Sequence, residues 1–139
     1  MAALTLASIK TAFYAVLKSD SAGAAVRASL GAGSAGVLLR RGLSLTLPVA
    51  PFLVITFGPM TGAREDVRTL FPTVWLYDDP IQDWARLHAL AALTEAVYVD
   101  DVIAYCYTNY AGGIGEEVID AALQQRPALA LRYQVRGRF

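Results

Sequence analysis

The sequence is poor in the side chains on which most catalytic sites depend. Its 139 residues include one cysteine, Cys106, and one histidine, His88. One cysteine cannot form a disulfide within the chain, so a reducing cytoplasm is the expected setting. A thiol nucleophile or a general base needs an orienting partner within reach, and no local signature surrounds either residue. We therefore expect no enzymatic activity, and we read Cys106 as a core thiol and His88 as a helix-surface imidazole.

The sequence also lacks the patterns of metal and phosphate sites. The acidic residues that stand close together are Asp78, Asp79 and Asp83, then Asp100 and Asp101, then Glu116 and Glu117. None of these groups has the spacing of a calcium-binding loop. The glycine-rich segment 112–115 lacks the lysine of a P-loop, and the two glutamates directly behind it would repel a phosphate. We expect no metal and no cofactor.

Charged residues are few, and the chain is apolar for its size. They make up 17% of the sequence against 55% hydrophobic residues, and the mean hydropathy is +0.42. A single small core cannot hide this much apolar surface, so a membrane or a subunit interface has to absorb the surplus. The longest uncharged stretch, residues 42–63, contains Pro48, Pro51 and Pro59, which break any bilayer-spanning helix. Since the first cation is Lys10, we expect no signal peptide either, and we assign the surplus to protein contacts.

The few charges are sorted along the chain. Residues 1–64 carry six cations and one acid, residues 65–120 carry eleven acids and two arginines, and the last nineteen residues carry four arginines and no acid. Such sorting indicates surfaces of opposite sign on one protomer, unless folding interleaves the segments.

An arginine row near the end of the sequence is the clearest candidate for such a surface. Arg132, Arg136 and Arg138 alternate with apolar residues, as in a strand with one polar face. A solvated sheet face and a nucleic-acid contact are both open interpretations. The charge sorting favours a third, in which the row meets acidic residues of a neighbouring copy. The predicted subunit interface consists of Arg132, Arg136, Arg138, Asp100, Asp101, Glu116 and Glu117.

Periodicity and turn residues predict one α+β domain over residues 1–139. Helices are expected at 4–18, 24–30 and 79–98, the last with Asp79 as N-cap, and strands at 52–57, 67–77, 102–110 and 129–139. Residues 37–47 fit a strand or an extended arm, and residues 116–125 fit a helix or a loop. The expected architecture is an antiparallel or mixed sheet of about four strands, with two main helices packed on one face.

The strand at 67–77 is apolar on both faces. Phe71, Thr73, Trp75 and Tyr77 fall on one face, and Leu70, Val74 and Leu76 fall on the other. The face turned away from the helices therefore needs cover from loops, a second layer or a neighbouring subunit.

Four segments together resemble a known family. The helix LTLASIKTAFYAVL, the hairpin PFLVITFG to VRTLFPTVWLYDDP, the long helix from Asp79 and the ending RYQVRGRF are similar to the tail terminator (tail completion) proteins of long-tailed phages and gene transfer agents. The resemblance covers nearly the whole chain as an order of elements. It contains no short motif from which site residues are carried over.

The resemblance implies a structural virion protein. Such a subunit forms a hexameric ring on the head-proximal end of the tail tube, ends tube polymerisation and joins the tail to the head connector. Its partners would be its own copies, the tail tube protein and the connector proteins, with DNA only passing through the lumen and no membrane involved. Its place would be the tail or neck of the virion, after assembly in the host cytoplasm.

Two other functions remain open from the sequence. One is a different neck component, such as a head-tail stopper or adaptor. The other is a small ligand-binding or enzymatic α+β domain that uses a cleft between the long helix and the third strand, near Tyr105, Cys106 and Tyr107.

Overall fold

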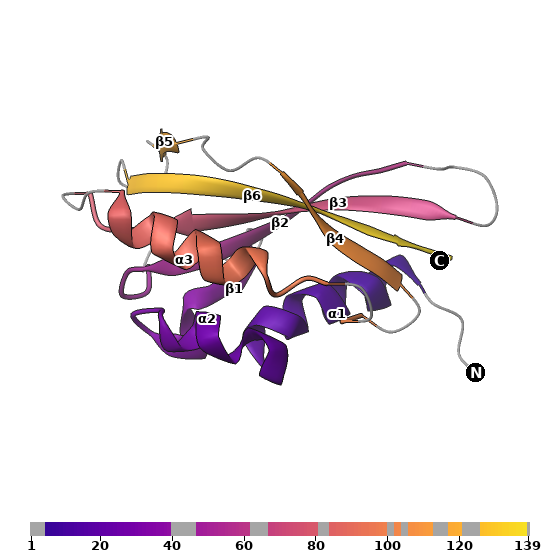
Figure 1. Ribbon diagram of the computed structural model, residues 1–139, viewed down its shortest axis with the longest axis horizontal. Helices are drawn as coiled ribbons and strands as arrows, with labels where there is room; N and C mark the ends of the chain where they lie inside the picture. Colours follow the sequence, from indigo (N-terminus) through magenta and orange to yellow (C-terminus); the bar gives the residue numbers. More distant parts are fainter. Residues whose placement is uncertain are drawn as a thin grey trace.

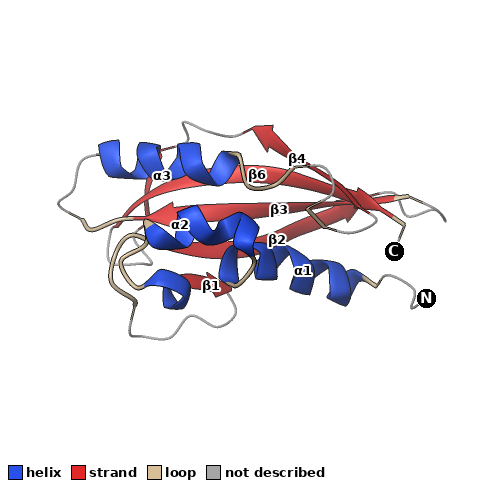
Figure 2. Ribbon diagram, turned by 60° about the horizontal axis from the view of Figure 1, so that its bottom comes forward, coloured by secondary structure: helices blue, strands red, loops and turns tan. Residues whose placement is uncertain are grey.

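The protein is an α+β fold in which the helices lie together on one face of a mixed sheet (Figures 1 and 2). The computed structural model describes residues 5–39, 47–61, 67–80, 84–99, 102–103, 106–112, 117–120 and 126–138. Its helices are α1 (Leu6–Lys18), α2 (Ala24–Ala28) and α3 (Ala85–Glu95), with short 3-10 helices η1 (Ser21–Gly23) and η2 (Gly33–Gly36). Its strands are β1 (Val37–Leu39), β2 (Phe52–Thr61), β3 (Arg68–Tyr77), β4 (Cys106–Gly112), β5 (Glu117–Asp120) and β6 (Arg126–Gly137).

The strand order is β1-β2-β3-β6-β4, and β5 also pairs with β6. β1 runs parallel to β2, whereas every other pairing is antiparallel, so the sheet is mixed. The predicted class and the helices on one face are confirmed. The four strands that were expected correspond to β2, β3, β4 and β6, and the short strands β1 and β5 add to them. β1 falls in the segment 37–47 that fitted a strand or an extended arm.

Helix α1 begins where its sequence places a reciprocal cap. The Thr5 hydroxyl accepts a hydrogen bond from the Ser8 backbone N–H at 3.1 Å, and the Ser8 hydroxyl accepts one from the Thr5 N–H at 2.9 Å. The helix buries the stripe that its periodicity predicted, namely Ile9, Phe13, Val16 and Leu17. This helix therefore anchors the helical layer on the sheet.

The connection from α1 to α2 depends on close backbone approach. A Cβ atom at Gly23 would lie 2.3 Å from a carbonyl oxygen of α1, so only glycine fits. The Arg27 guanidinium donates to the carbonyl oxygens of Leu17 at 2.8 Å and Asp20 at 2.6 Å. Neither η1 nor α2 has a side-chain cap, so these backbone contacts hold the connection.

Strand β6 has the alternation that its sequence predicted. Leu129, Leu131, Tyr133 and Val135 are fully buried toward the helices, whereas Arg132 and Arg136 are exposed on the other face. β6 lies at the centre of the fold, because it pairs with β3 along one edge and with β4 and β5 along the other.

At one end of the sheet, described residues cover the face opposite the helices. Phe52, Val54, Tyr77 and Ala128 form a second buried cluster there with Ala50, which belongs to the segment preceding β2. Leu38, Leu47 and Trp75 pack against this cluster. The prediction that the second apolar face of β3 needs cover is thus confirmed, and part of the cover comes from residues 47–51.

Helix α3 starts later than its sequence suggested. Asp79 and Pro80 do not cap it, since the helix begins at Ala85 with Trp84 at the N-cap position. The buried Asp78 carboxylate instead accepts hydrogen bonds from the Arg86 guanidinium, and Asp79 forms an ion pair with Arg126 at 3.3 Å. These acids join the end of β3 to α3 and β6, and this long-range pairing outweighs the local capping preference.

A stack of aromatic rings fills the centre of the core. The rings of Phe13 and Tyr98 lie parallel with centroids 4.0 Å apart, and Tyr133 meets both rings edge-on. Both phenols donate to backbone carbonyl oxygens: Tyr98 to Phe13 at 2.7 Å and Tyr133 to Thr94 at 3.0 Å. These bonds satisfy the polar ends of rings that are otherwise surrounded by apolar groups.

We predict that these two phenols make the fold sensitive to alkali. Burial raises the pKa of Tyr98 and of Tyr133 well above the ordinary value. In the unfolded chain both ionise near pH 10, so their contribution to stability is complete below that pH and is lost as the pH rises above it. The free energy of unfolding should fall by about 1.4 kcal/mol per pH unit for each tyrosine. Urea unfolding between pH 8 and 11.5 measures this slope, and Tyr98→Phe should remove its own share; equal slopes for both proteins would contradict the prediction.

Candidate functional site

The candidate site is the half of the far sheet face that β6 and β4 form. No helix lies on this side of β6 in the part of the chain that the structure describes (Figure 1). Arg132 and Arg136 point outward here four residues apart, a separation of about 13 Å along a strand. Arg138 follows β6 directly and is also exposed.

Residues of β3 and β4, the strands that flank β6, lie beside these arginines. Arg136 lies between Tyr107 of β4 and Thr69 of β3 in the register of the sheet, and Arg132 lies beside Thr73. Tyr107 is 51% exposed although it is a large aromatic residue. An exposed tyrosine next to arginines is the composition typical of protein interfaces, where both residue types are enriched.

These arginines make this part of the sheet surface positively charged. Ion pairs between described residues involve Asp78 and Asp79 with Arg86 and Arg126, and none of them involves Arg136 or Arg138. We call Arg132, Arg136, Arg138 and Tyr107 the arginine face.

The structure brings the predicted arginines together on one strand. Of the four predicted acids, it describes the position of Glu117 alone. Asp100, Asp101 and Glu116 lie outside the described residues. Glu117 opens β5, whose backbone pairs with β6 at Leu129, next to the end of β6 that lacks the arginine row. The expectation of a helix or loop over 116–125 is wrong at residues 117–120, because β5 pairs there with β6.

The three residues named for a cleft beside the third strand differ in their surroundings. Cys106 is 5% exposed and packs in the helix-side core, whereas Tyr107 points to the opposite face, and Tyr105 lies outside the described residues. Burial raises the pKa of the Cys106 thiol, which keeps it protonated and unreactive. His88 is exposed on α3.

Among the residues with described positions, no three His, Cys, Asp or Glu side chains gather as a metal site would require. None of the described helices has the length and apolarity needed to cross a bilayer.

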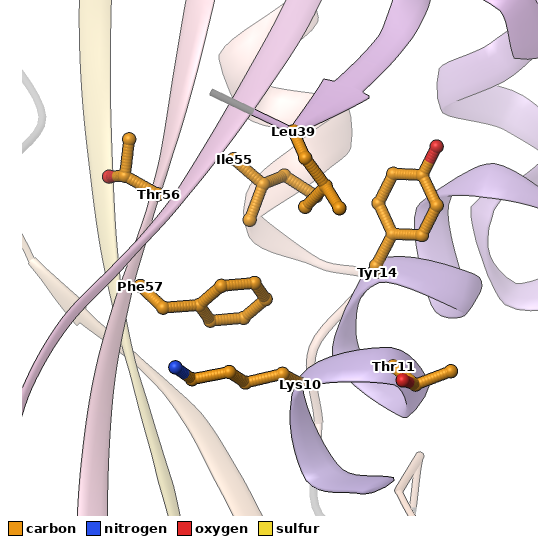
Figure 3. A pocket seen from close by; sticks show the side chains of 7 residues that line it. All are labelled: Lys10, Thr11, Tyr14, Leu39, Ile55, Thr56 and Phe57. Atoms are coloured by element: carbon orange, nitrogen blue, oxygen red, sulfur yellow. The ribbon is translucent and has the colours of Figure 1, made fainter. Parts of the chain in front are cut away.

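A pocket that sequence reasoning missed lies between α1 and the outer edge of the sheet (Figure 3). It has a volume of about 540 Å³ and is lined by Lys10, Thr11, Tyr14, Leu39, Ile55, Thr56 and Phe57. The only sequence signal was that Lys10, Thr11 and Tyr14 fall outside the buried stripe of α1. The sequence around these three residues does not show that β1 and β2 contact them.

Comparison with known proteins adds no family. No family model matches the chain, and a search of curated proteins found no match.

Proposed function

We propose that this protein is a structural virion subunit that forms a ring, caps the head-proximal end of a phage tail tube and ends tube polymerisation. It joins the tail to the head connector and has no enzymatic role. The observation that supports this proposal most directly is the arginine face, an exposed basic surface on the face of the sheet opposite the helices (Figure 1).

The charges favour contact between different patches of two copies. Two arginine faces repel each other, so a symmetric face-to-face dimer is disfavoured. An acidic patch on a neighbouring copy is attracted, and the candidates are Asp100, Asp101, Glu116 and Glu117. A contact between two unlike patches is head-to-tail, and repeating it closes a ring when the rotation between copies permits. The number of copies, six, is taken from the resemblance alone.

The surplus of apolar residues supports the same reading. The chain is 55% hydrophobic, yet large apolar side chains such as Val49 and Val99 remain more than half exposed after the core is filled. An assembled particle would bury such side chains against copies of the subunit, the tail tube protein or the connector proteins. DNA would pass through the lumen of the ring without a dedicated binding site.

The direct test is whether the purified protein binds tail ends. Gold-labelled protein is added to isolated headless tails and viewed by negative-stain electron microscopy. We expect label at one end of each tube, the end that would meet the head. Label on headed particles alone would favour the alternative of a head-tail stopper or adaptor, and absence of label from both would contradict a role in the neck.

A further inference from the structure

We propose that the arginine face also binds single-stranded nucleic acid, with phosphates on its arginines and bases on the aromatic rings beside them. The nucleic acid runs along β6 and is bound by the free subunit, before a neighbouring copy covers this face. The inference goes beyond ring formation, because it gives the same surface a second ligand of a different chemical class.

The first support is the line of positive charge on β6. Arg132, Arg136 and Arg138 are exposed and are separated by four and by two residues. Alternate side chains of a strand lie about 7 Å apart, so the three arginines extend over about 20 Å. Successive phosphates of an extended single strand have a similar repeat, and a guanidinium group binds phosphate oxygens through two parallel hydrogen bonds. Several phosphates of one strand can therefore meet arginines at the same time.

The second support is a pair of aromatic rings that flank the arginines and belong to neither buried cluster. Tyr107 of β4 lies beside Arg136 on one side of β6 and is 51% exposed. On the other side of β6, Phe71 of β3 lies beside the stretch between Arg132 and Arg136 and is partly exposed. A base of any kind stacks on such a ring, because every base has a π-face. The rings therefore offer stacking sites next to the phosphate contacts.

The architecture favours a single strand over a duplex and over an acidic protein segment. A duplex hides the faces of its bases and is read by elements that enter a groove. The face of an antiparallel sheet offers rings to bases that are already unpaired, and β3, β6 and β4 are neighbouring antiparallel strands. An acidic segment would meet the arginines, but aspartate and glutamate carry no ring to stack on Tyr107 and Phe71.

Matched ligands test this chemistry by fluorescence polarisation. The reference ligand is a fluorescein-labelled oligothymidylate of twelve nucleotides, which should bind. An abasic oligonucleotide with the same phosphates, a duplex of the same length and an oligoglutamate of the same length should each bind at least about tenfold more weakly. Failure of the oligothymidylate to bind, or binding of the abasic strand, duplex or oligoglutamate as tight as that of the oligothymidylate, would overturn the proposal.

Charge variants locate the phosphate contacts. Arg136→Gln should weaken binding of the oligothymidylate about tenfold, whereas Lys10→Gln removes the same charge from α1 and should leave it unchanged. The logarithm of the affinity should fall with the logarithm of salt concentration with a slope of about −2 for three phosphate contacts, and Arg136→Gln should make that slope shallower by about 0.7. Equal weakening by both variants would show a general attraction and would contradict a site on this face.

Variants of Tyr107 test the stacking. Tyr107→Ala should weaken the oligothymidylate at least about fivefold, and Tyr107→Phe, which keeps the ring, should bind like the parent. The abasic strand should not distinguish the alanine variant from the parent, because it has no base to stack. Circular dichroism and thermal unfolding confirm that each variant is folded. A phenylalanine variant as weak as the alanine variant would rule out stacking on this ring.

Nucleic acid and a neighbouring copy should exclude each other on the arginine face. Light scattering should show that added oligothymidylate converts the assembled protein to single protomers with bound oligonucleotide. A protein that is a monomer without oligonucleotide and still binds it would contradict ring formation and support this inference. A ring that forms and does not respond to the oligonucleotide would overturn this inference alone, so the two failures are distinguishable.

Discussion

Reversal of Arg132 and Arg136 to glutamate is expected to weaken self-association by about two orders of magnitude while the subunit stays folded. Both side chains are exposed on the far face of β6 and contribute little to the core. In the assembled state each would face the acids of a neighbour, and a like charge in a contact costs several kcal/mol. Sedimentation velocity over a range of protein concentrations measures the change.

A matched pair of variants separates the local contact from net charge. Arg132→Gln with Arg136→Gln, and Ala25→Glu with Ala28→Glu, each change the net charge of the protein by the same amount. Ala25 and Ala28 are exposed positions of α2 on the other side of the sheet. Only the arginine pair should weaken association. Normal assembly of the reversed protein would show that the arginine face is not the contact.

Replacement of Phe13 by alanine is expected to lower the free energy of unfolding by about 4 kcal/mol. Its ring is fully buried and stacks on Tyr98, with Phe57 and Tyr133 edge-on at 5.9 and 6.0 Å. Removing it deletes these contacts and leaves a cavity between α1 and the sheet that rigid neighbours cannot fill. Chemical denaturation of the variant and of the parent measures the loss.

Tyr107→Ala is the control for Phe13→Ala, because it also removes an aromatic ring. Half of the Tyr107 side chain is exposed, so its loss should cost no more than about 1 kcal/mol. The same substitution should weaken self-association, because Tyr107 lies beside Arg136 on the arginine face. A Phe13→Ala variant as stable as the parent would mean that the aromatic stack is not the centre of the core.

The long elements could be predicted from sequence because their burial follows their own periodicity. β6 alternates between Leu, Tyr or Val on one side and Arg or Gln on the other, and the structure buries the first set completely. The stripe of α1 repeats every three or four residues, and the same residues are buried. In both cases the periodicity within one element is enough to predict which of its side chains are buried.

The strand β5 and the partners of Asp78 and Asp79 could not be predicted, because residues outside each local pattern determine them. β5 has four residues, and its pairing with β6 at 126–129 overrides a pattern that also fits a helix. Asp78 and Asp79 look like helix caps, but Arg86 and Arg126 take them as partners. Neither the strand pairing nor the ion pairs can be predicted from the neighbouring residues in the sequence.

The candidate site could be predicted only in part, because some of its residues come together through contacts between different elements. The arginine row follows from the alternation of β6 alone. Tyr107 joins it only through the register of β4 on β6, and the pocket forms where α1, β1 and β2 meet. The sequence therefore predicted the arginines of the arginine face, but it predicted neither Tyr107 beside them nor the pocket.

We propose that this subunit associates with its own copies. Multi-angle light scattering of the purified protein, from low to high salt, tests it most directly. We predict a single species whose mass is a whole multiple of the 14.9 kDa protomer and which dissociates as salt screens the arginine face. A mass of one protomer at every protein and salt concentration would contradict the claim.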